Sequence, residues 1–282
     1  MMKNILTIDV EEYFYSEYVR NPSYVEYRTP HNLEYVLEIL NEFGVSATFF
    51  VVGEIVEKFP EVVKKIHERG HELAFHGWYH EPLWRLNAEN LRTEIKKFSS
   101  FAKKKCLGFR APHFSLNNET KWALKVLEDT GFIYDSSIFP MKTPLYGVWR
   151  APTTPYKPSH EDVAKEDENG KLWEFPLLVY PLFAFKIPVA GGFYLRFFPI
   201  NLIKKAVQRM NKHGFPAIIY IHNWELDPAM PKQKLGLLES FITYTNIRQT
   251  ERKLKHLLSN FQFMSFADFI KEKGSHLFNL RV

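Results

Sequence analysis

Cysteine is almost absent from this chain of 282 residues, because Cys106 is the only one. A single cysteine excludes an intrachain disulfide, a CxxC zinc site and an iron–sulfur cluster. Any metal must therefore be held by histidine, aspartate and glutamate side chains. A chain of this length buries roughly 75% of the surface that its unfolded state exposes, so it can form a core without such a crosslink.

The sequence also lacks a long hydrophobic run and a concentration of charge. No window reaches the ~18 apolar residues that a membrane span requires, and Asp9 arrives too early for the apolar core of a signal peptide. We therefore expect no membrane span and a cytoplasmic location. The net charge of +5 is spread over scattered basic residues, which argues against a nucleic-acid partner. The oligomeric state stays open.

Short apolar runs alternate with amphipathic segments over the first two thirds of the chain. This alternation predicts a parallel sheet or barrel with helices outside it. We expect strands at 5–8, 47–52, 73–75, 107–110, 132–134 and 217–221, with a short one at 172–175. Helices are expected at 32–43, 54–68, 87–104, 117–129, 200–212 and 247–258, and a last one from Ser265. The expected helix caps are Asn32, Asn87 and Asn117 or Asn118, and Gly44 and Gly131 are the expected stops.

The alternation breaks between about residues 140 and 190, where proline is dense and a polar, acidic stretch follows. We interpret this part as an irregular surface excursion. Because the chain shows no linker and no internal repeat, we expect one domain over residues 1–282.

Five segments that carry polar side chains follow predicted strands. In α/β barrels the carboxyl ends of the strands form the face where active sites are built. The segments are Asp9-Val-Glu11, His76-Gly-Trp-Tyr-His80, Arg110-Ala-Pro-His-Phe-Ser115, Tyr134-Asp135-Ser-Ser137 and Ile221-His222-Asn-Trp-Glu225.

Each segment has a chemical and an ordinary structural explanation. Asp9 and Glu11 point to one face of a strand and repel each other unless a cation or arginine lies between them. His76 and His80 can share one metal ion if their segment is helical. Arg110 can hold a carboxylate, and His222 titrates near neutrality, as a general acid should. Turn caps, buried histidines and a surface arginine are the alternatives, but five such explanations in order are improbable.

The ordered set resembles the polysaccharide deacetylase family, carbohydrate esterase family 4. The first motif of that family usually reads TFDDG, whereas this chain has Asp9-Val-Glu-Glu-Tyr-Phe14. A DVEDYF-like start is typical of the branch associated with exopolysaccharide export, as are RAPxFS, DSSI and HxWE motifs. The stretch Gly191-Gly-Phe-Tyr-Leu-Arg196 also looks like that branch, and the resemblance covers residues 4 to 260.

The resemblance implies a distorted (β/α) barrel of about seven parallel strands with the active site at their carboxyl ends. It implies hydrolysis of a linear amide, most simply removal of acetate from an N-acetylhexosamine in a glycan or its precursor. Glu11, His76 and His80 match metal ligands, with zinc the first expectation and cobalt, nickel or manganese as alternatives. Val10 stands where the family usually has its acidic ligand, so the choice between Glu11 and Glu12 stays open.

Four further residues match catalytic positions of the family. Asp9 matches the base, Arg110 the arginine that holds it, and His222 the general acid. Asp135 matches an acidic residue that supports the histidine. Residues expected to contact substrate are Tyr13, Phe14, Trp78, Pro112, Phe193, Tyr194 and Trp224, with core packing as their alternative.

Two other functions remain open at this point. An amidase for cyclic ureides or imides could use the same scaffold. A catalytically weak glycan-binding protein would keep the barrel without turnover. Metal content and acetate release separate these functions.

Overall fold

A computed structural model describes residues 2–16, 18–19, 22–102, 105–143, 146–183 and 185–273. By its contacts the chain divides into two compact units. The first consists of Met1–Phe49, Glu68–Glu72 and Val189–Val282, and the second consists of Phe50–His67 and Leu73–Pro188. Within the described residues, no helix is both long and apolar enough to cross a bilayer.

Eight strands form one sheet, in the order β10-β1-β2-β3-β4-β5-β6, with β9 also paired to β1. Each pair whose register is described in this sheet is parallel. This confirms the α/β class and the parallel strands expected of a distorted (β/α) barrel. The strands are β1 (Lys3–Val10), β2 (Thr48–Val51), β3 (Glu72–Phe75), β4 (Gly108–Phe109), β5 (Tyr134–Asp135), β6 (Trp173–Glu174), β9 (Ile218–His222) and β10 (Gln262–Met264).

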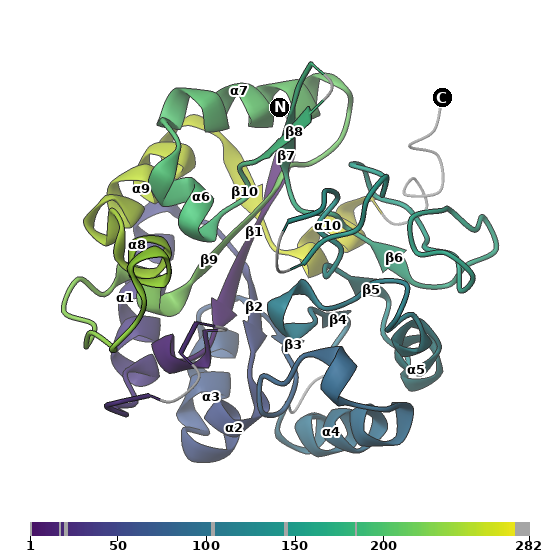
Figure 1. The fold of residues 1–282 in the computed structure, drawn as a ribbon, viewed down its shortest axis with the longest axis horizontal. Helices are drawn as coiled ribbons and strands as arrows, with labels where there is room; N and C mark the ends of the chain where they lie inside the picture. Colours follow the sequence, from purple (N-terminus) through teal and green to yellow (C-terminus); the bar gives the residue numbers. More distant parts are fainter. Residues whose placement is uncertain are drawn as a thin grey trace. The chain divides into compact units, whose positions relative to one another are not determined.

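In the first unit, β1 is the central strand and is buried from Ile5 onward on both faces. It pairs with β9 from Ile5 to Asp9 and with β10 from Lys3 to Ile5 (Figure 1). Strands buried on both faces read as continuous apolar runs, which is why Ile-Leu-Thr-Ile and Ile-Ile-Tyr-Ile were visible in the sequence. The helices of this unit are α1 (Thr29–Phe43), α6 (Gly192–Phe197), α7 (Ile200–Lys212), α8 (Leu237–Tyr244), α9 (Thr250–Asn260) and α10 (Phe266–Lys273).

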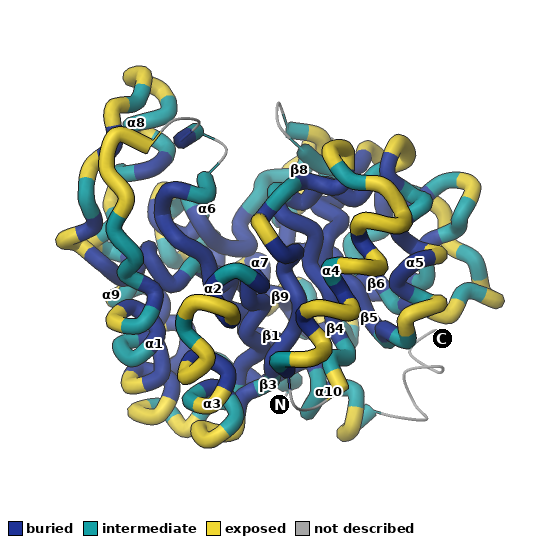
Figure 2. Tube along the Cα trace, turned by 90° about the horizontal axis from the view of Figure 1, so that it is seen from below, coloured by how far each residue is buried: buried dark blue, intermediate teal, exposed yellow. Residues whose placement is uncertain are grey.

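The second unit contains β4, β5, β6 and three complete helices. These helices are α2 (Gly53–Lys58), α4 (Ala88–Phe101) and α5 (Trp122–Thr130), and α3 (Glu61–Glu68) begins in this unit. Two strands that the sequence did not predict, β7 (Val179–Leu182) and β8 (Phe185–Pro188), form an antiparallel hairpin. They lie in the stretch that the sequence predicted to be an irregular surface excursion. This stretch also contributes to the core, because Tyr156 and Leu177 are buried; buried segments of the chain are dark blue in Figure 2.

Three of the predicted helix caps and stops were correct. Asn87 caps α4 as predicted, because its side chain accepts the backbone N–H groups of Glu89 and Asn90. Gly44 and Gly131 end α1 and α5 in the left-handed conformation, also as predicted. The predicted end of the 87–104 helix at Lys104 lies outside the described residues.

Two helix starts were predicted wrongly and one predicted helix is divided into two, and proline or a local turn explains each difference. α1 begins at Thr29, because Pro30 is well suited to the first helical turn. The expected helix 54–68 is two helices, α2 and α3, with Pro60 between them. α5 begins at Trp122, because Asn117 instead accepts the backbone N–H of Glu119 within a turn.

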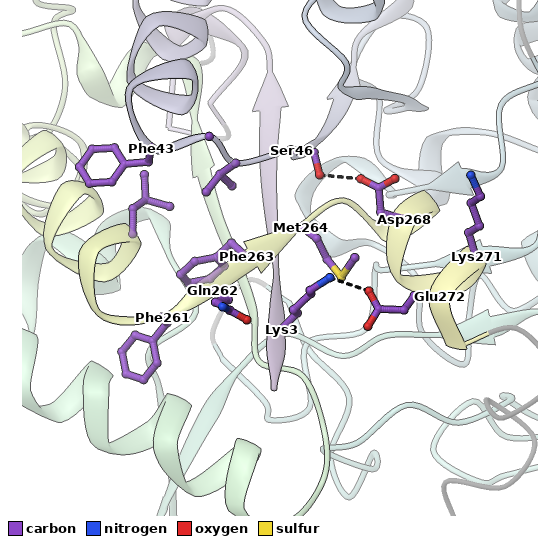
Figure 3. Close-up of a pocket in the computed structure, with 13 residues that line it drawn as sticks. Lys3, Phe43, Ser46, Phe261, Gln262, Phe263, Met264, Asp268, Lys271 and Glu272 are labelled. Carbon is purple, nitrogen blue, oxygen red and sulfur yellow. Dashed lines mark hydrogen bonds and ion pairs between the residues drawn. The ribbon is translucent and has the colours of Figure 1, made fainter. Parts of the chain in front are cut away.

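One pocket of about 750 Å³ lies at the amino end of β1 (Figure 3). Lys3, Met264 and Glu272 line it, and Lys3 forms an ion pair with Glu272. Lys3 begins β1, whereas Asp9 lies near its other end. The pocket is therefore separate from the predicted catalytic residues.

Candidate active site

Asp9 and Glu11 lie at the carboxyl end of β1, and both side chains are buried. Asp9 is the register partner of His222 on the neighbouring strand β9. The backbone N–H of Glu11 donates to the Oδ1 atom of Asn223, at 3.0 Å, and the indole N–H of Trp224 donates to Oε1 of Glu11, at 3.1 Å. The strand end and the turn after β9 thus fix the Glu11 carboxylate in place.

The side chain of Glu12 caps the start of α1. Its two carboxylate oxygens accept the backbone N–H groups of Arg28 and Thr29, at 3.0 and 2.9 Å, at the start of α1. Burial raises the pKa of Glu12, and these hydrogen bonds counteract the rise. A carboxylate that satisfies the exposed N–H groups of a helix start is a poor candidate for a metal ligand.

His222 ends β9 and is held on three sides. Its Nδ1 atom lies 3.1 Å from Oε2 of Glu225, and its Nε2 atom lies 3.7 Å from Oε1 of Glu11. The ring stacks on Trp224 with centroids 5.0 Å apart. Burial alone would lower the pKa of His222, but the nearby carboxylates, Glu11 first and Glu225 next, outweigh it and raise the pKa to about 9.

Within the first unit, the carboxylate beside His222 is that of Glu225. Support of this histidine by Asp135, which belongs to the second unit, stays a prediction. Glu225 is fully buried in the short 3-10 turn Asn223–Leu226, and its Oε1 atom accepts a 2.7 Å hydrogen bond from Nε of Arg196. Burial would raise the pKa of Glu225, but Arg196 and His222 lower it overall. The signal in the sequence was Glu225 itself, three residues after His222, where a tight turn brings the side chain back.

Arg196 is buried on α6 and connects this carboxylate to α8. Its Nη1 atom donates to the carbonyl oxygens of Thr243 and Thr245, at 3.1 and 2.6 Å, and its Nη2 atom donates to that of Ile242, at 3.0 Å. These carbonyls lie in and just beyond the last turn of α8. A buried guanidinium satisfied in this way provides a fixed positive charge beside Glu225.

In the second unit, His76 follows β3 and its Nδ1 atom lies 2.8 Å from the carbonyl oxygen of Arg110. A carbonyl oxygen only accepts, so Nδ1 carries the hydrogen and Nε2 keeps its lone pair. The segment to His80 is a turn, not the helix on which the predicted spacing depended, and Gly77 adopts a φ of 73° there. The turn still brings the His76 and His80 rings to 4.9 Å.

Arg110 is buried just after β4. Its Nε atom donates to the carbonyl oxygen of Ser136, at 2.9 Å, and its guanidinium lies 4.2 Å from the centroid of the Phe50 ring. Its predicted contact with Asp9 stays a prediction.

Asp135 pairs with another acid. Its carboxyl group shares a hydrogen bond with Glu174 and accepts one from the hydroxyl of Ser137. Burial raises the pKa of Asp135 to about 6 and, together with the charge of Asp135, raises that of Glu174 well above its usual range.

The three proposed ligands are divided between the units: Glu11 lies in the first, and His76 and His80 lie in the second. All three side chains are buried, and each is of a type that binds a divalent metal ion. Their binding of one shared ion stays a prediction.

The residues expected to contact substrate are mostly buried. Trp78 is only 1% exposed, its ring packs against the backbone of Gly53, and the ammonium of Lys97 lies over it. Tyr13, Phe14, Trp224 and Pro112 are buried as well. Their burial agrees with core packing, the alternative for these residues, and their contact with substrate stays a prediction. Phe193 and Tyr194 are half-buried.

Parts of this chain are similar in sequence to known proteins. Residues 22–132 match the family model Polysaccharide deacetylase, and residues 136–271 match a domain of unknown function, DUF3473. Over 117 residues the chain is 32% identical to the peptidoglycan deacetylase-like protein FGM2 of Gibberella zeae, a match that covers 39% of this chain and 34% of that protein. Over 95 residues it is 36% identical to a peptidoglycan-N-acetylglucosamine deacetylase of Bacillus cereus, covering 31% and 34%. The chain thus spans about a third of the length of these relatives.

Solved structures share the fold at low sequence identity. A Mycobacterium smegmatis protein assigned as a polysaccharide deacetylase aligns with a TM-score of 0.63 at 18% identity, covering 97% of this chain and 91% of that one. The peptidoglycan deacetylase PdaC of Bacillus subtilis aligns with a TM-score of 0.50 at 16% identity, covering 97% and 93%. Residues 22–132 are thus similar to polysaccharide deacetylases, and the solved structures show that the fold is shared.

Proposed function

We propose that this protein is a metal-dependent hydrolase that removes an N-acyl group, most simply acetate, from an N-acetylhexosamine in a glycan or glycan precursor. One observation carries the proposal: in the second unit the rings of His76 and His80 lie 4.9 Å apart, as two ligands of one metal ion would. In the first unit, Glu11 is held beside His222, with 3.7 Å between Oε1 and Nε2. We further propose that residues 1–282 act as one catalytic domain of the exopolysaccharide-associated branch.

The donor set fits a divalent ion. Two imidazoles and one carboxylate leave coordination positions open for water and substrate, and zinc is the first choice for such a set. His76 meets the requirement for an oriented ligand, because its Nδ1–H donates to the carbonyl of Arg110. A zinc ion held there would lower the pKa of a water molecule and polarise the amide carbonyl.

Asp9 and His222 are proposed as the proton-transfer pair. They are register partners on adjacent parallel strands, so their side chains leave the sheet side by side. Asp9 accepts the proton of the attacking water. His222, charged because Glu11 and Glu225 raise its pKa, donates a proton to the departing amine. An amine needs that proton, whereas an activated ester releases its leaving group without it.

The substrate class rests on the relatives. Curated matches include peptidoglycan and chitooligosaccharide deacetylases, whose substrates carry N-acetylated amino sugars. Removal of acetate from such a sugar is the simplest reaction consistent with the proposed residues.

The test is metal-dependent acetate release. The protein is stripped with a chelator, reloaded separately with zinc, cobalt, nickel and manganese, and assayed on N-acetylglucosamine oligomers. We expect one bound ion per chain and acetate release that returns with metal. His76→Ala should lose both, whereas His213→Ala, at an exposed histidine after α7, should lose neither. Metal binding without release from any amide would favour a glycan-binding protein, and no metal binding would overturn the proposed site.

A further inference from the structure

The surface of α8 carries more exposed apolar area than a solvent-facing helix needs. Leu237 is 95% exposed and Leu238 is 67% exposed, both in its first turn. Phe241, one turn further, is 47% exposed. Figure 2 shows the α8 segment largely in yellow and teal. A sequence of Leu-Leu-Glu-Ser-Phe at solvent is unusual, because contiguous exposed apolar side chains normally mark an interaction site.

Aromatic rings of α6 extend this area, and we name the five residues the α6–α8 apolar patch. The ring of Phe193 stacks on that of Phe197, with centroids 5.2 Å apart, and Phe241 contacts both at 5.9 and 6.1 Å. Phe197 is itself 47% exposed. The patch consists of Phe193, Phe197, Leu237, Leu238 and Phe241.

Basic residues flank the patch along the chain. Lys232 and Lys234 precede α8, Arg248 follows it, and all three are exposed. The segment between the lysines is attached to the helix, because the hydroxyl of Tyr244 accepts the backbone N–H of Gln233 at 2.6 Å. In the described part of the chain none of the three basic side chains forms an ion pair. The acidic Glu239 lies in the first turn of α8, near the backbone of Gly236.

We propose that the α6–α8 apolar patch binds the surface of an anionic lipid bilayer. Leucine and phenylalanine have no hydrogen-bonding group, so they suit the acyl boundary of a bilayer better than a sugar, whose stacking partners are typically tryptophan and tyrosine. The two leucines protrude and so can enter a bilayer. The flanking lysines and arginine supply the positive charge that attracts anionic headgroups.

The test is sedimentation of the protein with vesicles. Vesicles of phosphatidylcholine alone are compared with vesicles that mix phosphatidylcholine and phosphatidylglycerol, at low and at physiological salt. We expect binding to the mixed vesicles that weakens with salt. The pair Leu237→Ser and Leu238→Ser should weaken binding by about tenfold or more per leucine. Lys232→Gln and Lys234→Gln should each weaken it about fivefold, only on the anionic vesicles.

Val25→Ser, at an exposed aliphatic side chain outside the patch, is the matched control and should bind as the unaltered protein does. Thermal unfolding checks that each variant is folded, and exposed positions should leave the melting temperature unchanged. Absence of vesicle binding at low salt, or equal binding by the double leucine variant, would overturn the proposal. A dimer in sedimentation equilibrium that the leucine variant abolishes, without vesicle binding, would assign the patch to a second copy instead.

Discussion

Side chains that are close in sequence have different partners at the end of β1. Asp9 lies in register with His222, Glu11 is held by Asn223 and Trp224, and Glu12 caps α1. A run of three acidic residues within four positions thus provides a proposed base, a proposed ligand and a helix cap.

The proposed role of Asp9 leads to the first residue-scale prediction. Asp9→Asn should retain metal, because the ligands are elsewhere, but should lose most turnover, because an amide does not accept the proton of water. We expect a loss of roughly 10²–10⁴-fold in kcat. Metal content by atomic absorption and acetate release measure the two effects separately. If Asp9→Asn lost its metal as readily as His76→Ala, Asp9 would be a ligand.

Replacement of Glu225 gives the second residue-scale prediction, because it separates proton donation by His222 from metal binding. Glu225→Gln keeps the size of the side chain but removes the charge behind His222. We expect kcat on an N-acetyl amide to fall about 10- to 100-fold, the usual effect of losing a partner behind a functional histidine, with unchanged metal affinity. On an aryl acetate the loss should be much smaller, since that leaving group needs no proton. Equal losses on both substrates would show that Glu225 acts only on the stability of the site.

The sequence predicted the acids, histidines and arginine of the candidate site but not all of their partners. Asp9, Glu11, His76, His80 and His222 follow strands, and strand ends are recognisable from apolar runs. The ion pair between Glu225 and Arg196 was missed because it joins segments 29 residues apart, and no local pattern indicates such a contact. The contact of Glu225 with His222, three residues away, could have been predicted from the sequence.

At the scale of helices and strands, the elements that depend on adjacent residues were predicted, and those that depend on distant partners were not. The apolar runs of β1 and β9 and the asparagine before α4 were readable, because a buried strand and a helix cap depend on adjacent residues. β10 and the β7–β8 hairpin were missed. Their strands are three or four residues long, and pairing with distant partners determines them more than their own propensity does.

One prediction belongs to the junction between elements before β2 and β3. His71 is buried, and its Nδ1 atom accepts the backbone N–H of Ala47 at 3.3 Å. Burial lowers the pKa of His71 to about 4, from its ordinary value of 6.5. The unfolded chain therefore binds more protons between these values, and the free energy of unfolding should decrease as the pH falls through this range.

His71→Asn preserves an acceptor near the Nδ1 position and removes the titration. Urea unfolding at neutral pH and at about pH 5 should show a smaller decrease in the free energy of unfolding in this variant, by about 2 kcal/mol. At pH values below both pKa values the difference should approach about 3 kcal/mol. The control is His213→Asn, at an exposed histidine, which should behave like the unaltered protein. An unchanged pH dependence in His71→Asn would mean that other groups cause it.

At the scale of the whole molecule, the parallel sheet was predictable because its alternation of strands and helices repeats along the chain. The division into two compact units was not, because each unit draws on segments far apart in the sequence. The first unit joins the amino-terminal strand to residues from Val189 onward, so β1 pairs with strands more than 200 residues away. Such pairings are costly in loop-closure entropy, and they are expected to form late in folding.

In the first unit, Arg196 connects the exposed helix α8 to the buried carboxylate of Glu225. The same guanidinium that binds Glu225 also binds three carbonyl oxygens at the end of α8. A ligand that shifts these carbonyls would also move the Arg196 guanidinium away from Glu225. Because Glu225 orients the ring of His222, the orientation of His222 would change as well. A ligand on α8 and a ligand at the proposed active site would then be allosterically linked, and each would alter the affinity for the other by the same factor.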